Sequence, residues 1–299
     1  MPAMSPNTTT TAVPSVRLST IIGQSLHNAL QWRLLLLWAV LLVLPTLVAT
    51  LPAWQMLGDS LDLSVQAAAL AQALDLASVS DLMQVSKRYL PALGNGAVVA
   101  VVLTLFLSPL LSGMTIAAAR APQRLGLGGL LGGGMLEYGR LLRMLVWASV
   151  PLAAAFALGG AVSTPLRSLG ASALLESTAQ NAGMAATAVV AIVVLLAHAT
   201  VDAGRAVLAA DRRKTSAVRA WGEGVMLVLR QPGATLGSYV AITLAGLVLA
   251  ALIALVRVRV APIEGVAFAL ALVLTQLGVM AVAWMRAARL FALIELVRK

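Results

Sequence analysis

The chain has 299 residues, of which 60% are hydrophobic and only 11% are charged. Ordinary globular proteins carry about 25% charged residues, so this composition excludes a water-soluble globular protein, which needs polar groups over its surface. The formal net charge is +10, and cysteine is absent, which excludes disulfides, thiolate metal sites and thiol catalysis.

The N-terminal residues 1–14 are rich in Thr, Ser and Pro and show no apolar period, which predicts a disordered tail. The rest of the chain, residues 15–299, is expected to form a single transmembrane domain of six helices. Its first element is a short amphipathic helix over residues 19–33, in which apolar residues recur every fourth position beside polar ones. We expect that helix to lie on the membrane surface.

Six intervals between consecutive charged residues exceed the roughly 20 residues that a helix needs to cross a bilayer. The predicted spans cover approximately residues 34–54, 97–119, 144–164, 185–204, 237–256 and 265–285. Their apolar runs are continuous and do not alternate as the strands of a transmembrane barrel do. The predicted fold class is therefore all-α: a polytopic membrane protein with six transmembrane helices and interfacial amphipathic helices.

Further helical patterns occur between the spans. Residues 52–93 carry apolar side chains at helical spacing, which predicts one or two helices on the outer face. Residues 130–143 and 216–230 are apolar stretches that end in arginine directly before the third and fifth spans. With the first helix they suggest three repeated units, although charged flanks alone would produce this pattern. The run LGLGGLLGGG, residues 125–134, lacks the spacing of a dinucleotide-binding loop.

Lysine and arginine are distributed unevenly among the segments outside the spans. The two tails and the second and fourth connections hold 16 of them, whereas the other three connections hold 5. Because cytoplasmic segments retain positive charge, both termini are predicted to be cytoplasmic. This topology explains the net charge of +10, so no nucleic-acid-binding function is needed to account for it.

Seven aromatic residues lie near the ends of predicted spans: Trp32, Trp38, Trp54, Tyr89, Trp147, Tyr239 and Trp284. Amphipathic rings favour the headgroup level of a bilayer, so these side chains are expected to form an aromatic belt. The belt supports the span boundaries independently of charge.

His198, Asp202 and Arg205 lie at the inner end of the fourth span, at positions i, i+4 and i+7 of one helix face. The carboxylate is placed to orient the imidazole or to pair with the guanidinium. Two interpretations follow. The first is a structural polar network, since charges at a span end are ordinary, and the second is a ligand or proton site.

A stripe of hydroxyl groups follows the second span at helical spacing: Thr104, Ser108, Ser112 and Thr115. Gln276 places an amide near the centre of the sixth span. Both features are explained by hydrogen bonds between helices, each of which stabilises the helix packing by about 1 kcal/mol or less. The alternative is a polar path for a solute through the membrane.

Residue types that usually carry chemistry are scarce. The two histidines lie on distant segments, match no metal-ligand spacing and adjoin no nucleophile motif. No phosphate-binding loop is recognisable. The sequence therefore predicts a protein without a cofactor, a metal or an enzymatic activity.

Two segments carry a resemblance to a known group of proteins. They are LSTIIGQSLHNALQWRLLLLWAVLLVLP, residues 18–45, and TVDAGRAVLAADRRKTSAVRAWGEGVMLVLRQPGATLGSYV, residues 200–240. Both resemble poorly characterised bacterial six-helix membrane proteins related to the membrane domain of some glycerophosphodiester phosphodiesterases. In that group an Asp-x-x-Arg element ends the fourth span, and here this element is Asp202 to Arg205. The resemblance implies the fold and a bacterial inner-membrane location, but not phosphodiesterase activity, because no catalytic domain of that kind is present.

These observations favour a non-enzymatic protein of the bacterial inner membrane that acts through protein partners or lipids. Its basic helices are expected to meet anionic headgroups at the inner face, at about 1 kcal/mol per well-placed cation. A homo-oligomer is a further expectation for its partners. The alternative function is a transporter or the permease subunit of a transport complex, since six spans with interfacial helices are also typical of these.

Overall fold

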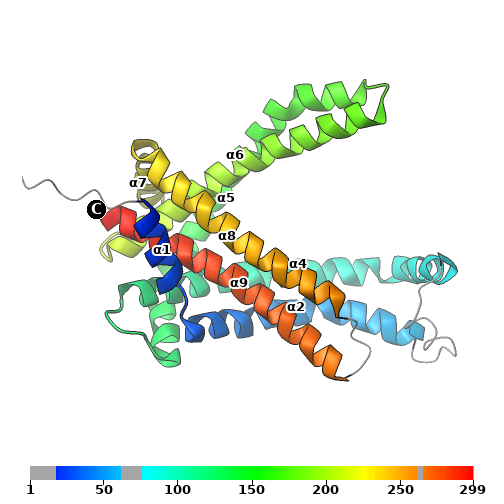
Figure 1. Cartoon of the computed structure of the whole chain (residues 1–299), viewed down its shortest axis with the longest axis horizontal. Coiled ribbons are helices and arrows are strands. Elements are labelled where there is room, and N and C mark those ends of the chain that lie inside the picture. Colours follow the sequence, from blue (N-terminus) through cyan, green and yellow to red (C-terminus); the bar gives the residue numbers. More distant parts are fainter. Residues whose placement is uncertain (1–17, 62–75, 261–264, 299) are drawn as a thin grey trace, which may run out of the picture.

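The computed structural model describes residues 18–61, 76–260 and 265–298 (Figure 1). Every regular element in these ranges is an α-helix, because the apolar runs keep their backbone hydrogen bonds within the segment. The helices are α1 (Leu18–Asn28), α2 (Trp32–Leu61), α4 (Leu76–Arg120), α5 (Leu127–Ala171), α6 (Glu176–Ala210), α7 (Ala217–Arg230), α8 (Pro232–Arg259) and α9 (Gly265–Arg298). The predicted disordered tail, residues 1–14, lies outside the described residues.

Six of these helices are long and apolar enough to cross a membrane, namely α2, α4, α5, α6, α8 and α9. Each predicted span lies within one of them, so the prediction of an all-α fold with six apolar membrane-length helices is confirmed. The chain is a multi-pass membrane protein.

Two predicted interfacial elements are not separate helices. Residues 130–143 are continuous with the third span in α5, and residues 76–93 are continuous with the second span in α4. Of the remaining part of the predicted outer helices, residues 52–61 are continuous with the first span in α2, and residues 62–75 lie outside the described residues. In α5 the cause is packing, because Gly134 faces Gly113 of α4 so closely that a Cβ on Gly113 would lie 2.7 Å from the carbonyl oxygen of Gly134. One face of this segment therefore packs against α4, whereas Met135 and Leu136 on it are exposed.

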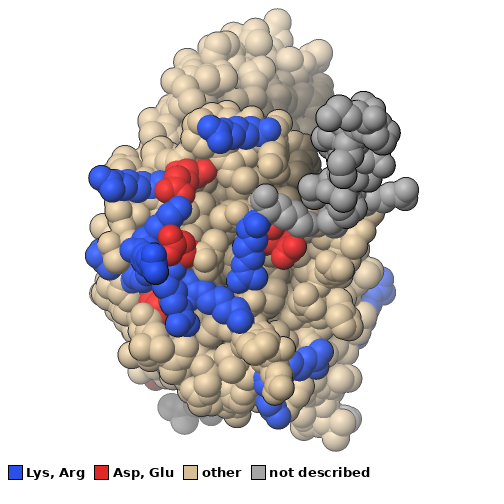
Figure 2. All heavy atoms as spheres, turned by 90° about the vertical axis from the view of Figure 1, so that its left-hand side faces the viewer, with Lys and Arg blue, Asp and Glu red and all other residues tan. Residues whose placement is uncertain are grey.

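Helices α1 and α7 and the C-terminal end of α9 lie at the same end of the molecule, on the left in Figure 1. Ser216 caps α7, since its hydroxyl accepts a hydrogen bond from the backbone N–H of Arg219. Trp284 of α9 donates its indole N–H to the carbonyl oxygen of Leu26 at 2.9 Å and so attaches α1 to α9. Figure 2 views this end directly and shows many lysine and arginine side chains on it. We call it the basic end.

The interior of the protein also lies near the basic end. Buried apolar side chains come from the segments of the six long helices closest to it and include Leu34, Met114, Met144, Leu208, Ile242 and Leu293. Farther away, the hairpin of α5 and α6 points away from α8 and α9 (Figure 1). Its large apolar side chains, such as Phe156 and Ile192, are exposed, as expected for surfaces that face lipid. Among the described residues, the buried charged side chains Glu137, Asp202 and Arg289 all lie near the basic end.

The residues of the predicted aromatic belt differ in exposure. Trp32 is 60% exposed and Trp54 is 76% exposed, as expected for rings at a membrane boundary. Trp38 and Tyr239 are only 4% and 2% exposed, because neighbouring helices cover them. These two rings contact protein instead of headgroups.

Candidate functional site

Asp202 of α6 is the centre of a polar network at the basic end. The helix places His198, Asp202 and Arg205 on one face, as their spacing predicts. Arg205 Nη1 lies 2.8 Å from Asp202 Oδ1, and His198 Nδ1 lies 3.5 Å from Asp202 Oδ2. The Asp202 side chain is only 10% exposed, so its charge depends on these partners.

Two residues from other helices complete the Asp202 network. Arg289 of α9 brings Nη2 to 3.6 Å from Asp202 Oδ2 and donates from Nη1 to the hydroxyl of Tyr239 of α8 at 2.9 Å. The same hydroxyl lies 2.7 Å from His198 Nδ1. The Arg289 guanidinium also lies 4.6 Å from the Tyr239 ring centroid, which is a cation–π contact. The network thus joins α6, α8 and α9.

A cavity of about 750 Å³ lies beside this network. We call it the arginine cavity, because Arg205, Arg286 and Arg289 line it. Its other polar lining residues include Asp202, His198, Thr104, Ser108, Ser112 and Thr115. The structure therefore brings the predicted boundary network and the predicted hydroxyl stripe to one site, although they lie on α6 and α4 and are far apart in the sequence.

Other expectations for these residues differ from the structure. Gln276 lies on α9 but does not line the arginine cavity. Thr104 and Thr115 do not bond to other helices, because their hydroxyls donate to the carbonyl oxygens of Ala100 and Leu111 in α4 itself. A threonine in a helix reaches the carbonyl four residues earlier without needing a neighbour. The explanation of the stripe by hydrogen bonds between helices is therefore wrong at these two positions.

Sequence reasoning missed Tyr239, Arg286 and Arg289 as members of the site. The sequence shows Arg286 and Arg289 only as basic residues after the sixth span, and Tyr239 as a member of the predicted aromatic belt. Their i, i+3 spacing did place both arginines on one face of the helix. That signal shows a shared face, but not which helix the face meets.

The charges of the arginine cavity do not balance. Three guanidinium groups line it, whereas Asp202 is the one carboxylate among its lining residues. Asp202 is shared between Arg205 and Arg289. Arg286 forms no ion pair or hydrogen bond with any residue in the described ranges. The cavity therefore has an excess of positive charge in its polar part.

A second buried cluster, which we call the Glu137 cluster, lies nearby. Glu137 of α5 is 6% exposed and pairs with Arg120 at 2.5 Å and with Arg140 at 2.6 Å. Arg120 donates to the carbonyl oxygens of Leu208 and Ala209, at the end of α6. The last carbonyl groups of a helix have no hydrogen-bond donors within the helix, and here the guanidinium supplies donors to two of them. Its positive charge also interacts favourably with the negative end of the helix dipole.

Arg140 forms hydrogen bonds with the connection between α6 and α7. Its guanidinium donates to the carbonyl oxygens of Leu208, Asp211 and Lys214 at 2.7 to 3.0 Å. Glu137 forms ion pairs with both arginines that make these contacts. The Glu137 cluster is therefore a structural unit that joins α4, α5 and the α6–α7 connection. The i, i+3 spacing of Glu137 and Arg140 is visible in the sequence, but no spacing reveals their contacts with Arg120 and the α6–α7 connection.

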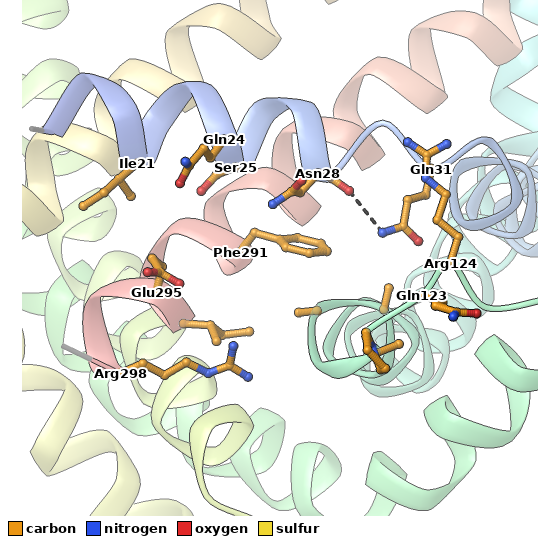
Figure 3. Close-up of a pocket in the computed structure, with 15 residues that line it drawn as sticks. Ile21, Gln24, Ser25, Asn28, Gln31, Gln123, Arg124, Phe291, Glu295 and Arg298 are labelled. Atoms are coloured by element: carbon orange, nitrogen blue, oxygen red, sulfur yellow. Dashed lines mark hydrogen bonds between the residues drawn. The ribbon is translucent and has the colours of Figure 1, made fainter. Parts of the chain in front are cut away.

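A smaller cavity of about 340 Å³ lies between α1, the segment after α4 and the end of α9 (Figure 3). Its lining is rich in carboxamides: Gln24, Asn28, Gln31 and Gln123. Figure 3 shows Phe291 among these groups and the hydrogen bond from Gln31 to the carbonyl oxygen of Asn28, which is 3.1 Å long. Arg124, Arg298 and Glu295 also line it, so it has both charges and no single preferred ligand charge.

No family model, no curated protein and no solved structure matches the chain. The functional argument therefore rests on the geometry of the site. The arginine cavity combines donors, an excess of positive charge and apolar walls, which are the properties of a site for a negatively charged ligand.

Proposed function

We propose that this chain is a non-enzymatic protein of the bacterial inner membrane that acts by binding lipids at its basic end, with both termini in the cytoplasm. One observation carries the proposal: the basic end exposes arginines that no described carboxylate neutralises. Arg213, Arg219 and Arg230 are exposed, and no ion pair joins them to other described residues. All three lie on α7 or directly before it.

The position of α7 supports this function. Its buried residues Ala217, Ala220 and Gly224 pack against the protein, which leaves the charged face free. A helix of this kind at a membrane surface meets headgroups, and each cation near an anionic surface contributes about 1 kcal/mol. The inner leaflet supplies anionic headgroups, in agreement with the predicted topology.

The test is the melting temperature of the purified protein in neutral detergent, with added dioleoyl phosphatidylglycerol or dioleoyl phosphatidylcholine. We expect the anionic lipid to raise the melting temperature more than the zwitterionic one, because a ligand that binds the folded state stabilises it. Substitution of Arg213, Arg219 and Arg230 by Gln should reduce this difference. Substitution of Arg257 and Arg259 by Gln, at the other end of α8, should preserve it. Equal effects of the two lipids on the parent protein would contradict the proposal.

A second candidate function is a transporter or the permease subunit of a transport complex. The observation that favours it is the arginine cavity, which places charged side chains between membrane-length helices. Mild purification distinguishes the two functions. A stoichiometric nucleotide-hydrolysing partner would favour the permease subunit, whereas full lipid dependence of the isolated chain would favour the first function.

A further inference from the structure

The arginine cavity is elongated along α4 and has a polar and an apolar end. Thr115 lies near its basic end, and Thr104 lies toward the middle of the helix. At about 1.5 Å per residue these two positions span roughly 16 Å. This length is close to the depth of the hydrocarbon in one leaflet, which is half of the roughly 30 Å core.

The two ends differ in chemistry. Arg286 and Arg289 lie beyond the predicted sixth span, so the guanidinium groups belong to the end at the membrane boundary. The opposite end is lined by Leu105, Phe106 and Leu152. Leu105 is 48% exposed and Phe106 is 57% exposed, so this wall borders the surface that faces lipid. A ligand with an apolar chain therefore has access from the bilayer.

The polar end has more donors than acceptors. Arg286 contributes an exposed guanidinium without an ion pair, and the Nε of Arg289 and the indole Nε1 of Trp38 are buried and have no hydrogen-bond partner among the described residues. Buried donors without acceptors cost roughly 1–3 kcal/mol each. A bound anion would lower these costs, since guanidinium groups form paired, charge-assisted hydrogen bonds with phosphate oxygens.

We propose that the arginine cavity binds the phosphate group of an anionic amphiphile, with Arg286 as its principal phosphate ligand and the walls around Leu105, Phe106 and Leu152 covering its chain. The inference rests on the proposed lipid-binding function and adds to it one specific site. The phosphate belongs to a lipid headgroup or to a soluble phosphate compound, and the experiment below distinguishes these sources.

The experiment measures equilibrium binding to the purified full-length protein by native mass spectrometry. The probes are dioctanoyl phosphatidylglycerol, dioctanoyl phosphatidylcholine, glycerol 3-phosphate and inorganic phosphate. The variants are Arg286→Gln, which removes the unpaired charge, Arg286→Lys, which retains it, and Ser112→Leu, which fills the cavity with apolar volume. Arg259→Gln is the matched control, because it removes an exposed arginine at the other end of α8, outside the cavity.

We expect phosphatidylglycerol to bind the parent protein more tightly than phosphatidylcholine. Arg286→Gln should weaken that binding about tenfold or more, as for the loss of a charged hydrogen bond. Ser112→Leu should weaken it as well, Arg286→Lys should retain part of it, and Arg259→Gln should change it little. Binding of phosphatidylglycerol alone would identify a lipid headgroup as the source. Equally tight, Arg286-dependent binding of glycerol 3-phosphate or inorganic phosphate would identify a soluble compound.

The site is refuted if Arg286→Gln and Ser112→Leu both bind phosphatidylglycerol as the parent does. If binding then depends on Arg213, Arg219 and Arg230, the proposed function stands without this site. If phosphatidylglycerol neither binds nor stabilises the parent protein, both proposals fail. Size-exclusion profiles establish that each variant is folded, and if Arg286→Gln does not fold, the comparison of Ser112→Leu with the parent decides.

Discussion

Glu137 and Asp202 each form ion pairs with more than one arginine, but the two carboxylates have different surroundings. Glu137 bonds Arg120 and Arg140, which in turn bond main-chain carbonyl groups, so that cluster has its acceptors within the protein. Asp202 lies beside a cavity whose lining includes the unpaired guanidinium of Arg286. The first arrangement fits a structural role, and the second fits a binding site.

At this scale we predict that Glu137→Gln destabilises the protein strongly. The change leaves Arg120 and Arg140 buried without a carboxylate, and breaking a buried ion pair costs roughly 3–5 kcal/mol. The measurement is the melting temperature in detergent. The control is Glu223→Gln, which removes the ion pair between Glu223 and Lys214, whose side chains are 49% and 38% exposed. Loss of such an exposed pair should lower the free energy of unfolding by about 1 kcal/mol or less. Equal melting temperatures of the two variants would refute the structural role of the Glu137 cluster.

At the scale of the helices, glycine sets how closely neighbouring elements pack. A Cβ on Gly224 of α7 would lie 2.5 Å from the backbone nitrogen of Gly204 of α6, and a Cβ on Gly133 of α5 would lie 2.4 Å from the Cβ of Ala117 of α4. Small residues permit such close contacts between membrane helices. The glycine-dense run at residues 125–134, which matches no nucleotide-binding loop, therefore has a packing role at Gly133 and Gly134.

The matched variants Gly224→Ala and Gly222→Ala test this packing. Both replace glycine by alanine within α7, so both improve helix propensity by about 1 kcal/mol. Gly222 has no atom within 4 Å of an added Cβ, whereas Gly224 has backbone atoms of α6 in that place. We expect Gly222→Ala to melt at or above the temperature of the parent protein, and Gly224→Ala to melt below it and to expose α7 to protease. Equal protection of α7 in both variants would show that its contact with α6 is not close-packed in the membrane.

At the scale of the whole molecule, the six long helices are packed against one another near the basic end and separate toward the other end, where α5 and α6 diverge from α8 and α9 (Figure 1). Buried charge is tolerated only where several helices exclude lipid and supply partners. Both charged clusters accordingly lie near the basic end. The orientation of that end in the membrane decides whether its headgroup partners are those of the inner leaflet.

Reporter fusions test this orientation. Fusions after Asp75, Arg167 and Glu264 should report the outside, because few basic residues surround these positions. Fusions after Arg124, Arg213 and Lys299 should report the cytoplasm. If all six fusions report the opposite side, the basic end faces the outside, and lipids of the inner leaflet cannot be its ligands. If a single fusion reports the opposite side, the span boundaries must be redrawn.

The sequence by itself determined the six membrane-length helices, because a charge-free apolar interval is a local property and a helix satisfies its backbone within that interval. It also placed His198, Asp202 and Arg205 on one face, because helical spacing is local as well. Only the tertiary structure decided that this face meets the hydroxyl stripe of α4 and two arginines of α9 around one cavity. The physical reason is that periodicity shows which residues of a helix share a face, whereas the partner of that face depends on packing between segments far apart in the sequence.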